Sequence, residues 1–137
     1  MVRARGSSVA TAVVGLVVLV SVAGCANSQD GEVRRVADSF YAAVGSHDGG
    51  AACDALAPGT VQELEESAEA PCREAILSED LPGAGAVGSV HVFGTTAQVR
   101  YGDDTAFLSR FQFGWRVMAA ACRPQPHGPY DCQVKGG

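Results

Sequence analysis

The sequence predicts an α+β domain in which N-terminal helices pack on a curved antiparallel β-sheet. Three observations predict this order. From Glu32, apolar residues recur every three or four positions, which is typical of a helix that buries one face. A segment rich in glycine and proline, 82–85, then interrupts the helical pattern. From Val87, apolar and polar residues alternate, which is typical of strands that bury one face.

The first helix is predicted to begin near Glu32 and to end at Gly45, with Asp30 as its N-cap. Residues 25–31, which precede it, are mostly polar and are predicted to form a tether. The predicted buried face repeats at helical spacing and comprises Val33, Val36, Ala37, Phe40, Tyr41 and Val44.

Three shorter helices are predicted next. One spans residues 50–56, and another spans residues 60–67, with Thr60 as its cap and Glu63 completing a capping box. Pro71 is predicted to open the last helix, because proline suits the first helical turn.

The second half of the chain predicts a meander of antiparallel strands joined by short turns. In one of them, Ala97, Val99 and Tyr101 share a face and are expected to point into the core. The predicted strands are 89–93, 96–101, 105–111, 115–122 and 130–134.

The chain has 5 cysteines, an odd number that leaves one unpaired in an exported protein. If Cys25 carries a lipid, as its sequence context described below implies, four cysteines remain, and four cysteines allow three pairings. Their positions form two local couples, so we expect the disulfides Cys53–Cys72 and Cys122–Cys132. A zinc site is the competing interpretation, but the chain contains no C-x-x-C pair.

The first 24 residues have the pattern of a secretory signal. Arg3 and Arg5 come first, a stretch of apolar residues follows, and small residues end it. The apolar stretch, 9–23, is shorter than the ~20 residues that a membrane-spanning helix needs. A cleaved signal is therefore predicted in place of a permanent span.

The end of this stretch, Val22-Ala23-Gly24-Cys25, resembles the lipobox of bacterial lipoproteins. The resemblance implies a diacylglyceryl group on Cys25, cleavage after Gly24, and acylation of the new amino terminus, for example with palmitate. It also implies a location at the extracytoplasmic face of the cell membrane. The competing interpretation is a plain signal peptide followed by an incidental cysteine.

Without residues 1–24 the chain keeps eight basic and fifteen acidic residues, a net charge of −7. An acidic domain argues against nucleic acid as a partner and against electrostatic binding to anionic lipid. The lipid on Cys25 is therefore the expected link to the membrane. Residues 32–137 are enough for one domain and not for two.

The same domain resembles the NTF2-like (SnoaL-like) cone fold, with its Phe-Tyr first helix, helical hairpin and long strands. In particular, it is similar to small actinobacterial lipoproteins of that superfamily. The residues that carry this similarity are the segment Gly114-Trp115-Arg116-Val117, Cys122, and the segment Pro129-Tyr130-Asp131-Cys132. Members of the superfamily include isomerases, dehydratases, polyketide cyclases and binding domains, so the fold alone does not determine the function.

Asp38 and Tyr41 are the candidate catalytic pair, because they lie three residues apart on the first helix and share a face. An isomerase would need a carboxylate base in an apolar pocket together with a hydrogen-bond donor. The alternative, which we adopt, is a solvated acid beside a core tyrosine. No catalytic residue is therefore predicted.

Other residues that could carry chemistry form no site pattern. The histidines lack metal-ligand spacing, the serines lack a nucleophile elbow, and the glutamates lack a calcium-loop pattern, so we expect neither metal nor cofactor. Four aromatic residues could line a ligand cavity, but we expect them to fill the core. The histidines, serines, glutamates and aromatic residues considered are His47, His91, His127, Ser89, Ser109, Glu63, Glu65, Glu66, Glu69, Phe107, Phe111, Phe113 and Trp115.

We predict a lipid-anchored envelope protein that is not an enzyme and that binds a protein or a small apolar ligand in its cone. Two alternatives stay open: a lipid-anchored enzyme of the isomerase or cyclase type, and an accessory protein for envelope signalling. An enzyme should show converging acid and donor groups, a binder an open apolar cavity, and an accessory protein a filled cone with an exposed patch.

Overall fold

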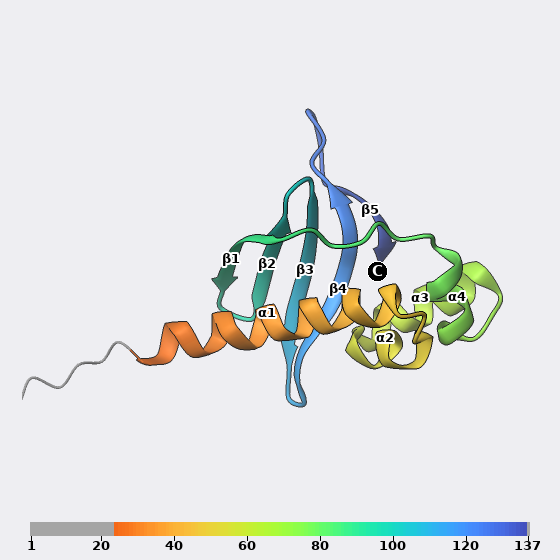
Figure 1. Cartoon of the computed structure of the whole chain (residues 1–137), viewed down its shortest axis with the longest axis horizontal. Coiled ribbons are helices and arrows are strands. Elements are labelled where there is room, and N and C mark those ends of the chain that lie inside the picture. Colours follow the sequence, from red (N-terminus) through yellow and green to blue (C-terminus); the bar gives the residue numbers. More distant parts are fainter. Residues whose placement is uncertain (1–23, 137) are drawn as a thin grey trace, which may run out of the picture.

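The computed structural model describes the backbone of residues 24–136 and the side chains of residues 29–136. Within this range four helices precede five strands, so the α+β prediction is confirmed. Figure 1 shows the long helix α1 passing along the sheet, with the short helices gathered beyond its C-terminus. The elements are α1 Gly24–Gly45, α2 Gly49–Ala55, α3 Pro58–Ala68, α4 Cys72–Ser78, β1 Val87–Phe93, β2 Thr96–Tyr101, β3 Asp104–Phe111, β4 Gly114–Arg123 and β5 Asp131–Lys135.

The predicted signal peptide up to residue 23 and the side chain of Cys25 lie outside the part of the chain that the structure describes. Cleavage after Gly24 and lipid attachment therefore stay predictions. Among residues 24–136, no helix is both long and apolar enough to cross a membrane.

The strands form one antiparallel sheet in the order β1-β2-β3-β4-β5, with β1 and β5 at its two open edges. Because each strand pairs with the next one in sequence, successive connections alternate between the two ends of the sheet. The β1–β2 and β3–β4 turns lie at one end, and the β2–β3 turn and β4–β5 loop lie at the other (Figure 1). Each end therefore gathers residues from two separate parts of the sequence.

Helix α1 begins earlier than predicted. It starts at Gly24, so the predicted tether, residues 25–31, is helical, and Asp30 lies inside the helix and not at its cap. The polar residues before Val33 have no apolar periodicity, so the pattern that marks a buried face starts only after the helix has begun. The predicted end at Gly45 is confirmed.

The short helices are held together by a disulfide and by a close backbone approach. Cys53 of α2 is bonded to Cys72, the first residue of α4. A side chain at Gly49 would collide with the carbonyl group of Arg73, so glycine allows α2 and α4 to approach here. Helices α2 and α4 are thereby fixed against each other.

The capping box predicted at Thr60 is wrong. Helix α3 begins at Pro58, with Ala57 at the cap and no side-chain capping bond, so Thr60 lies inside the first turn. Proline suits the first helical position because its missing N–H has no helical partner there. The buried Thr60 hydroxyl donates instead to the carbonyl of Met118 at 2.9 Å, which ties α3 to β4.

Strand β4 is irregular where it pairs with β3. It carries an extra residue on each side of Ala119, which makes two β-bulges. A bulge shifts the alternation of side chains, so the buried positions change from Trp115 and Val117 to Ala120 and Cys122 along the strand. The sheet therefore bends at this point.

Beyond the bulges, Cys122 lies opposite Cys132 of β5, and the two form the second disulfide. Both disulfides join the pairs that sequence spacing predicts. Their partners are separated by 19 and 10 residues. Each cross-link is worth about 3 kcal/mol in the chain-entropy model, which is substantial for a domain of this size.

Candidate functional site at the mouth end of the sheet

The β2–β3 turn (residues 101–104) and the β4–β5 loop (residues 123–131) form one end of the sheet, which we call the mouth end. Two buried tyrosines lie just inside it. Tyr41 comes from α1 and Tyr101 from the end of β2. Their rings pack edge to face, with centroids 5.1 Å apart. Ala97, Val99 and Tyr101 of β2 are all buried, as their alternation predicts.

Each tyrosine hydroxyl is bonded to a carboxylate on the opposite element. The Tyr41 hydroxyl donates to Asp104 of β3 at 2.6 Å and accepts from the backbone N–H of Ala121 at 3.1 Å. The Tyr101 hydroxyl donates to Asp38 of α1 at 2.8 Å. These bonds satisfy both buried phenols and fasten α1 to the sheet from two directions.

Burial, and then the hydrogen bond to Asp104, raises the pKa of Tyr41 above that of an exposed tyrosine. Burial and then the hydrogen bond to Asp38 raise the pKa of Tyr101 in the same way. Desolvation disfavours the charged phenolate, and the neighbouring carboxylate disfavours it further. Both hydroxyls therefore keep their protons and act as donors at neutral pH.

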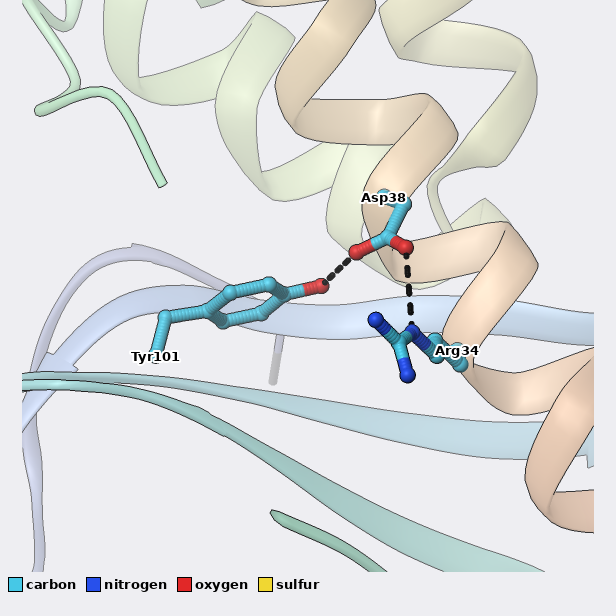
Figure 2. Close-up of polar contacts among 3 residues, drawn as sticks. All are labelled: Arg34, Asp38 and Tyr101. Atoms are coloured by element: carbon cyan, nitrogen blue, oxygen red, sulfur yellow. Dashed lines mark hydrogen bonds and ion pairs between the residues drawn. The ribbon is translucent and has the colours of Figure 1, made fainter. Parts of the chain in front are cut away.

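Asp38 is a surface residue whose side chain is 45% exposed. Figure 2 shows its contacts with Tyr101 and Arg34. One carboxylate oxygen accepts from Tyr101, and the other lies 3.5 Å from Nε of Arg34, one helical turn earlier. The prediction of a solvated acid beside a buried tyrosine is confirmed for Asp38 and Tyr41. The described contacts, however, pair each of these residues with the sheet and not with each other.

Ala121 lies in a strained conformation at the second bulge of β4. Its φ of 53° is in the left-handed region, which costs an L-residue other than glycine roughly 1–2 kcal/mol. The bulge turns the Ala121 N–H toward the Tyr41 hydroxyl. Strain of this kind is common next to binding sites.

A pocket of about 380 Å³ opens at the mouth end, and Ala121 lies in its wall. Tyr101 also lines it, and residues 82–83, from the segment that crosses the sheet between α4 and β1 (Figure 1), form one side. Its charged lining comprises Asp103, Asp104, Asp131 and Arg123. With three carboxylates and one guanidinium, the pocket can hold a polar ligand and favours positive charge.

The other candidates from the sequence do not converge. His47, His91 and His127 are all exposed and lie in a turn, on β1 and in the β4–β5 loop. Among the described side chains, no group of three or more His, Cys, Asp or Glu could hold a metal ion. The glutamates of α3 are exposed, and Glu65 accepts from the backbone N–H of Cys72 at 2.9 Å, which caps α4.

The four aromatic residues expected in the core differ in how far they are buried. Trp115 is buried, as predicted. Phe107 and Phe111 are only half-buried, and Phe113 is 56% exposed, so the prediction is wrong for Phe113. Phe113 lies in the turn that follows β3.

Sequence reasoning missed the residues that complete the mouth end. Asp104 lies between the predicted strands 96–101 and 105–111, but it begins β3 and accepts a hydrogen bond from the Tyr41 hydroxyl across 63 residues of sequence. No local pattern marks a pair so far apart. Ala121 carries no signal at all, because alanine is not a residue that indicates a positive φ.

Comparison of the chain with protein-family models, with curated proteins and with solved structures found no match.

Proposed function

We propose that this protein is a lipid-anchored domain on the extracytoplasmic face of the cell membrane, and that it acts by binding and not by catalysis. The anchor is a diacylglyceryl group on Cys25, and residues 1–24 are removed by cleavage after Gly24. The basic start, apolar stretch and lipobox-like end support this. Two disulfides also fit a domain that folds in an oxidising compartment.

The resemblance to the NTF2-like cone belongs to the same proposal. It is supported by the order of elements, with a long helix packed across an antiparallel sheet and short helices beyond it. The sheet is open at β1 and β5, so the cone would be shallow. Its interior is filled by side chains such as Phe40, Ile76 and Trp115.

The pocket at the mouth end is the proposed binding site. Its volume of about 380 Å³ lies within the range of small-ligand sites, roughly 300–1,000 Å³. The filled interior and the charged lining support a polar, positively charged ligand, or a basic segment of a protein partner, more than a small apolar ligand. The charge of the mature domain points the same way.

The observation that carries the non-enzymatic assignment is the pairing of the two tyrosines. An isomerase-type base needs a carboxylate enclosed by apolar groups, whereas Asp38 is 45% exposed and ion-paired to Arg34. The donors that could assist such a base, Tyr41 and Tyr101, already donate to Asp104 and Asp38. Their hydroxyl groups therefore serve to hold the fold.

An accessory role in envelope signalling is the second candidate. It is favoured by a filled interior together with two exposed phenylalanines, Phe93 at 66% and Phe113 at 56%. Exposed apolar side chains that gather in one place mark contact surfaces, and both residues lie at the same end of the sheet. This candidate function has the same lipid anchor as the first, but the partner would contact the exposed phenylalanines and not the pocket at the mouth end.

The anchor is tested by the intact mass of the protein purified from membranes of the producing cell. We expect a chain that begins at Cys25 and carries the mass of a diacylglyceryl group. The Cys25→Ser variant should stay unlipidated and uncleaved at this site. Recovery of wild-type protein that is full-length, or that has an unmodified Cys25, would contradict the proposal.

The pocket is tested with two double variants of equal charge change. Asp103→Asn/Asp131→Asn alters the mouth end, and Glu63→Gln/Glu69→Gln alters the exposed face and end of α3. We expect partners captured from solubilised membranes to bind the first variant at least about tenfold more weakly, a loss of ~1.4 kcal/mol. Partner binding that falls equally in both variants would show that the mouth end is not the site.

A further inference from the structure

The end of the sheet opposite the mouth end exposes aromatic side chains. We call it the phenylalanine end and define it as the β1–β2 turn (residues 93–96) and the β3–β4 turn (residues 111–114). Among the described side chains, three large apolar residues are exposed, and two of them, Phe93 and Phe113, lie here. Exposed apolar groups that gather on one side of a molecule mark a contact surface.

Both phenylalanines are held in place by their neighbours. The Phe113 ring stacks on Phe111 with centroids 5.2 Å apart, and the guanidinium of Arg116 lies 5.0 Å from the Phe113 centroid. The Phe93 ring stacks on His91 at 6.3 Å. The rings are therefore presented in defined positions at the ends of hairpins.

The phenylalanine end lies beside the first turns of α1. Phe93 and the adjoining part of β1 share a surface hollow with Gln29 and Asp30. A methyl group at Gly114 would stand 3.7 Å from Oε1 of Glu32. In Figure 1 the β1–β2 and β3–β4 turns are on the side of the sheet along which α1 passes.

This position brings the turns close to the proposed lipid attachment site. Gln29 is four residues after Cys25, which is about 6 Å along a helix axis. Glu32 is seven residues after Cys25, or about 10 Å. A bilayer that holds a lipid on Cys25 would therefore lie next to Phe93 and Phe113.

Charge is also arranged in favour of this contact. Residues 91–96 and 109–116 contain no Asp or Glu, and their ionisable residues are His91, Arg110 and Arg116. The nearby acidic groups are Asp30 and Glu32 of α1. The mouth end, in contrast, gathers Asp103, Asp104 and Asp131, and would point away from an anionic membrane.

We propose that the phenylalanine end rests on the bilayer and inserts Phe93 and Phe113 at the boundary between headgroups and acyl chains. This inference rests on the proposed lipid anchor and adds an orientation to it. The anchor keeps the domain at the surface, and the two rings fix which end faces the lipid. Apolar side chains at this depth bind by burial of apolar area, so the contact does not require a basic domain.

The test places a fluorescent side chain at each end of the sheet. Phe113→Trp reports on the phenylalanine end, and His127→Trp, in the β4–β5 loop, is the matched control at the mouth end. The native Trp115 is buried, and its fluorescence in the wild-type protein is the background. Each lipidated protein is reconstituted in phosphatidylcholine–phosphatidylglycerol vesicles with and without bromine on the acyl chains.

Bromine should quench about half or more of the fluorescence added by Phe113→Trp, because a side chain at the headgroup boundary meets the acyl chains. It should not quench the fluorescence added by His127→Trp. The quenching should persist at about 1 M salt, because screening weakens contacts between exposed charges and not apolar insertion.

Equal quenching of the two variants, or none above background, would overturn the orientation if the mass of Cys25 still includes lipid. Dimeric lipoprotein whose Phe113→Trp fluorescence is not quenched would assign the surface to a second copy of the chain. Protein whose Cys25 carries no lipid would overturn the anchor and this inference together.

Discussion

The two ends of the sheet differ in the side chains that they carry. At the mouth end, Tyr41 and Tyr101 are buried and bonded to carboxylates, a bulge is strained at Ala121, and a disulfide closes the last hairpin. At the phenylalanine end, Phe93 and Phe113 protrude into solvent from short turns. The difference separates buried, hydrogen-bonded side chains that hold the fold from exposed rings that do not.

The comparison shows where substitutions should matter. Groups at the mouth end bond to one another, so removing one leaves another without its partner in a buried place. Rings at the phenylalanine end contribute little to the core, so removing them should leave stability almost unchanged.

The largest loss is expected from Cys122→Ala/Cys132→Ala. Loss of this cross-link should lower the free energy of unfolding by about 3 kcal/mol. Urea denaturation of the oxidised wild-type and variant proteins measures the difference. If stability is unchanged, the disulfide is not what secures the mouth end.

Tyr41→Phe should lower the free energy of unfolding by about 2 kcal/mol, because it leaves the Ala121 N–H and Asp104 without their partner. Tyr130→Phe is the matched control. Its hydroxyl accepts only from Gln98 in the described contacts, so the loss should be below about 1 kcal/mol. Equal losses in the two variants would remove the special role given to Tyr41.

Alkaline pH should destabilise the protein through the same tyrosines. Their pKa values are raised in the folded state, so their contribution is fully present below the unfolded pKa of about 10 and is lost as pH rises above it. Two such groups give a slope of about −2.7 kcal/mol per pH unit above pH ~10. Denaturation at several pH values measures this slope, and Tyr41→Phe should reduce it by half. A slope that Tyr41→Phe leaves intact would show that Tyr41 ionises alike in both states.

The smallest loss is expected at the other end. Phe93→Ser/Phe113→Ser should change the free energy of unfolding by less than about 1 kcal/mol, as surface substitutions usually do. Both side chains are more than half exposed. Thermal and urea denaturation of the variant provide the measurement. A loss as large as that of Tyr41→Phe would mean that the rings are part of the core and not a contact surface.

Much of the fold follows from patterns that are local in the sequence. Helical periodicity predicts the apolar face of α1, alternation predicts the buried face of β2, and short spacing predicts both disulfides. The early start of α1 could not be predicted, because residues 25–31 show no apolar periodicity in the sequence. Thr60 was wrongly predicted as an N-cap for a related reason. A threonine that precedes a helix and a threonine in its first turn have the same local sequence pattern.

The mouth end depends on contacts that are distant in the sequence. Tyr41 and Asp104 are 63 residues apart, as are Asp38 and Tyr101. Only the packing of α1 across the sheet brings them together, and only the bulge turns the Ala121 N–H to Tyr41. The sequence marks Asp38 and Tyr41 as a pair on one helix face, but it does not indicate that each has its partner on the sheet.

Amide hydrogen exchange at the two ends of the sheet, in lipidated protein bound to nanodiscs, tests the orientation of the domain most directly. Wild-type protein is compared with Phe93→Ser/Phe113→Ser, and both are also measured in detergent to show any change that does not depend on the bilayer. In nanodiscs, and not in detergent, we predict that amides of residues 91–96 and 109–116 exchange more slowly in the wild type than in the variant. Amides of residues 100–105 and 122–132 should exchange equally in the two proteins. Equal exchange of the two proteins at the phenylalanine end, or bilayer-dependent protection of the mouth end, would contradict the account.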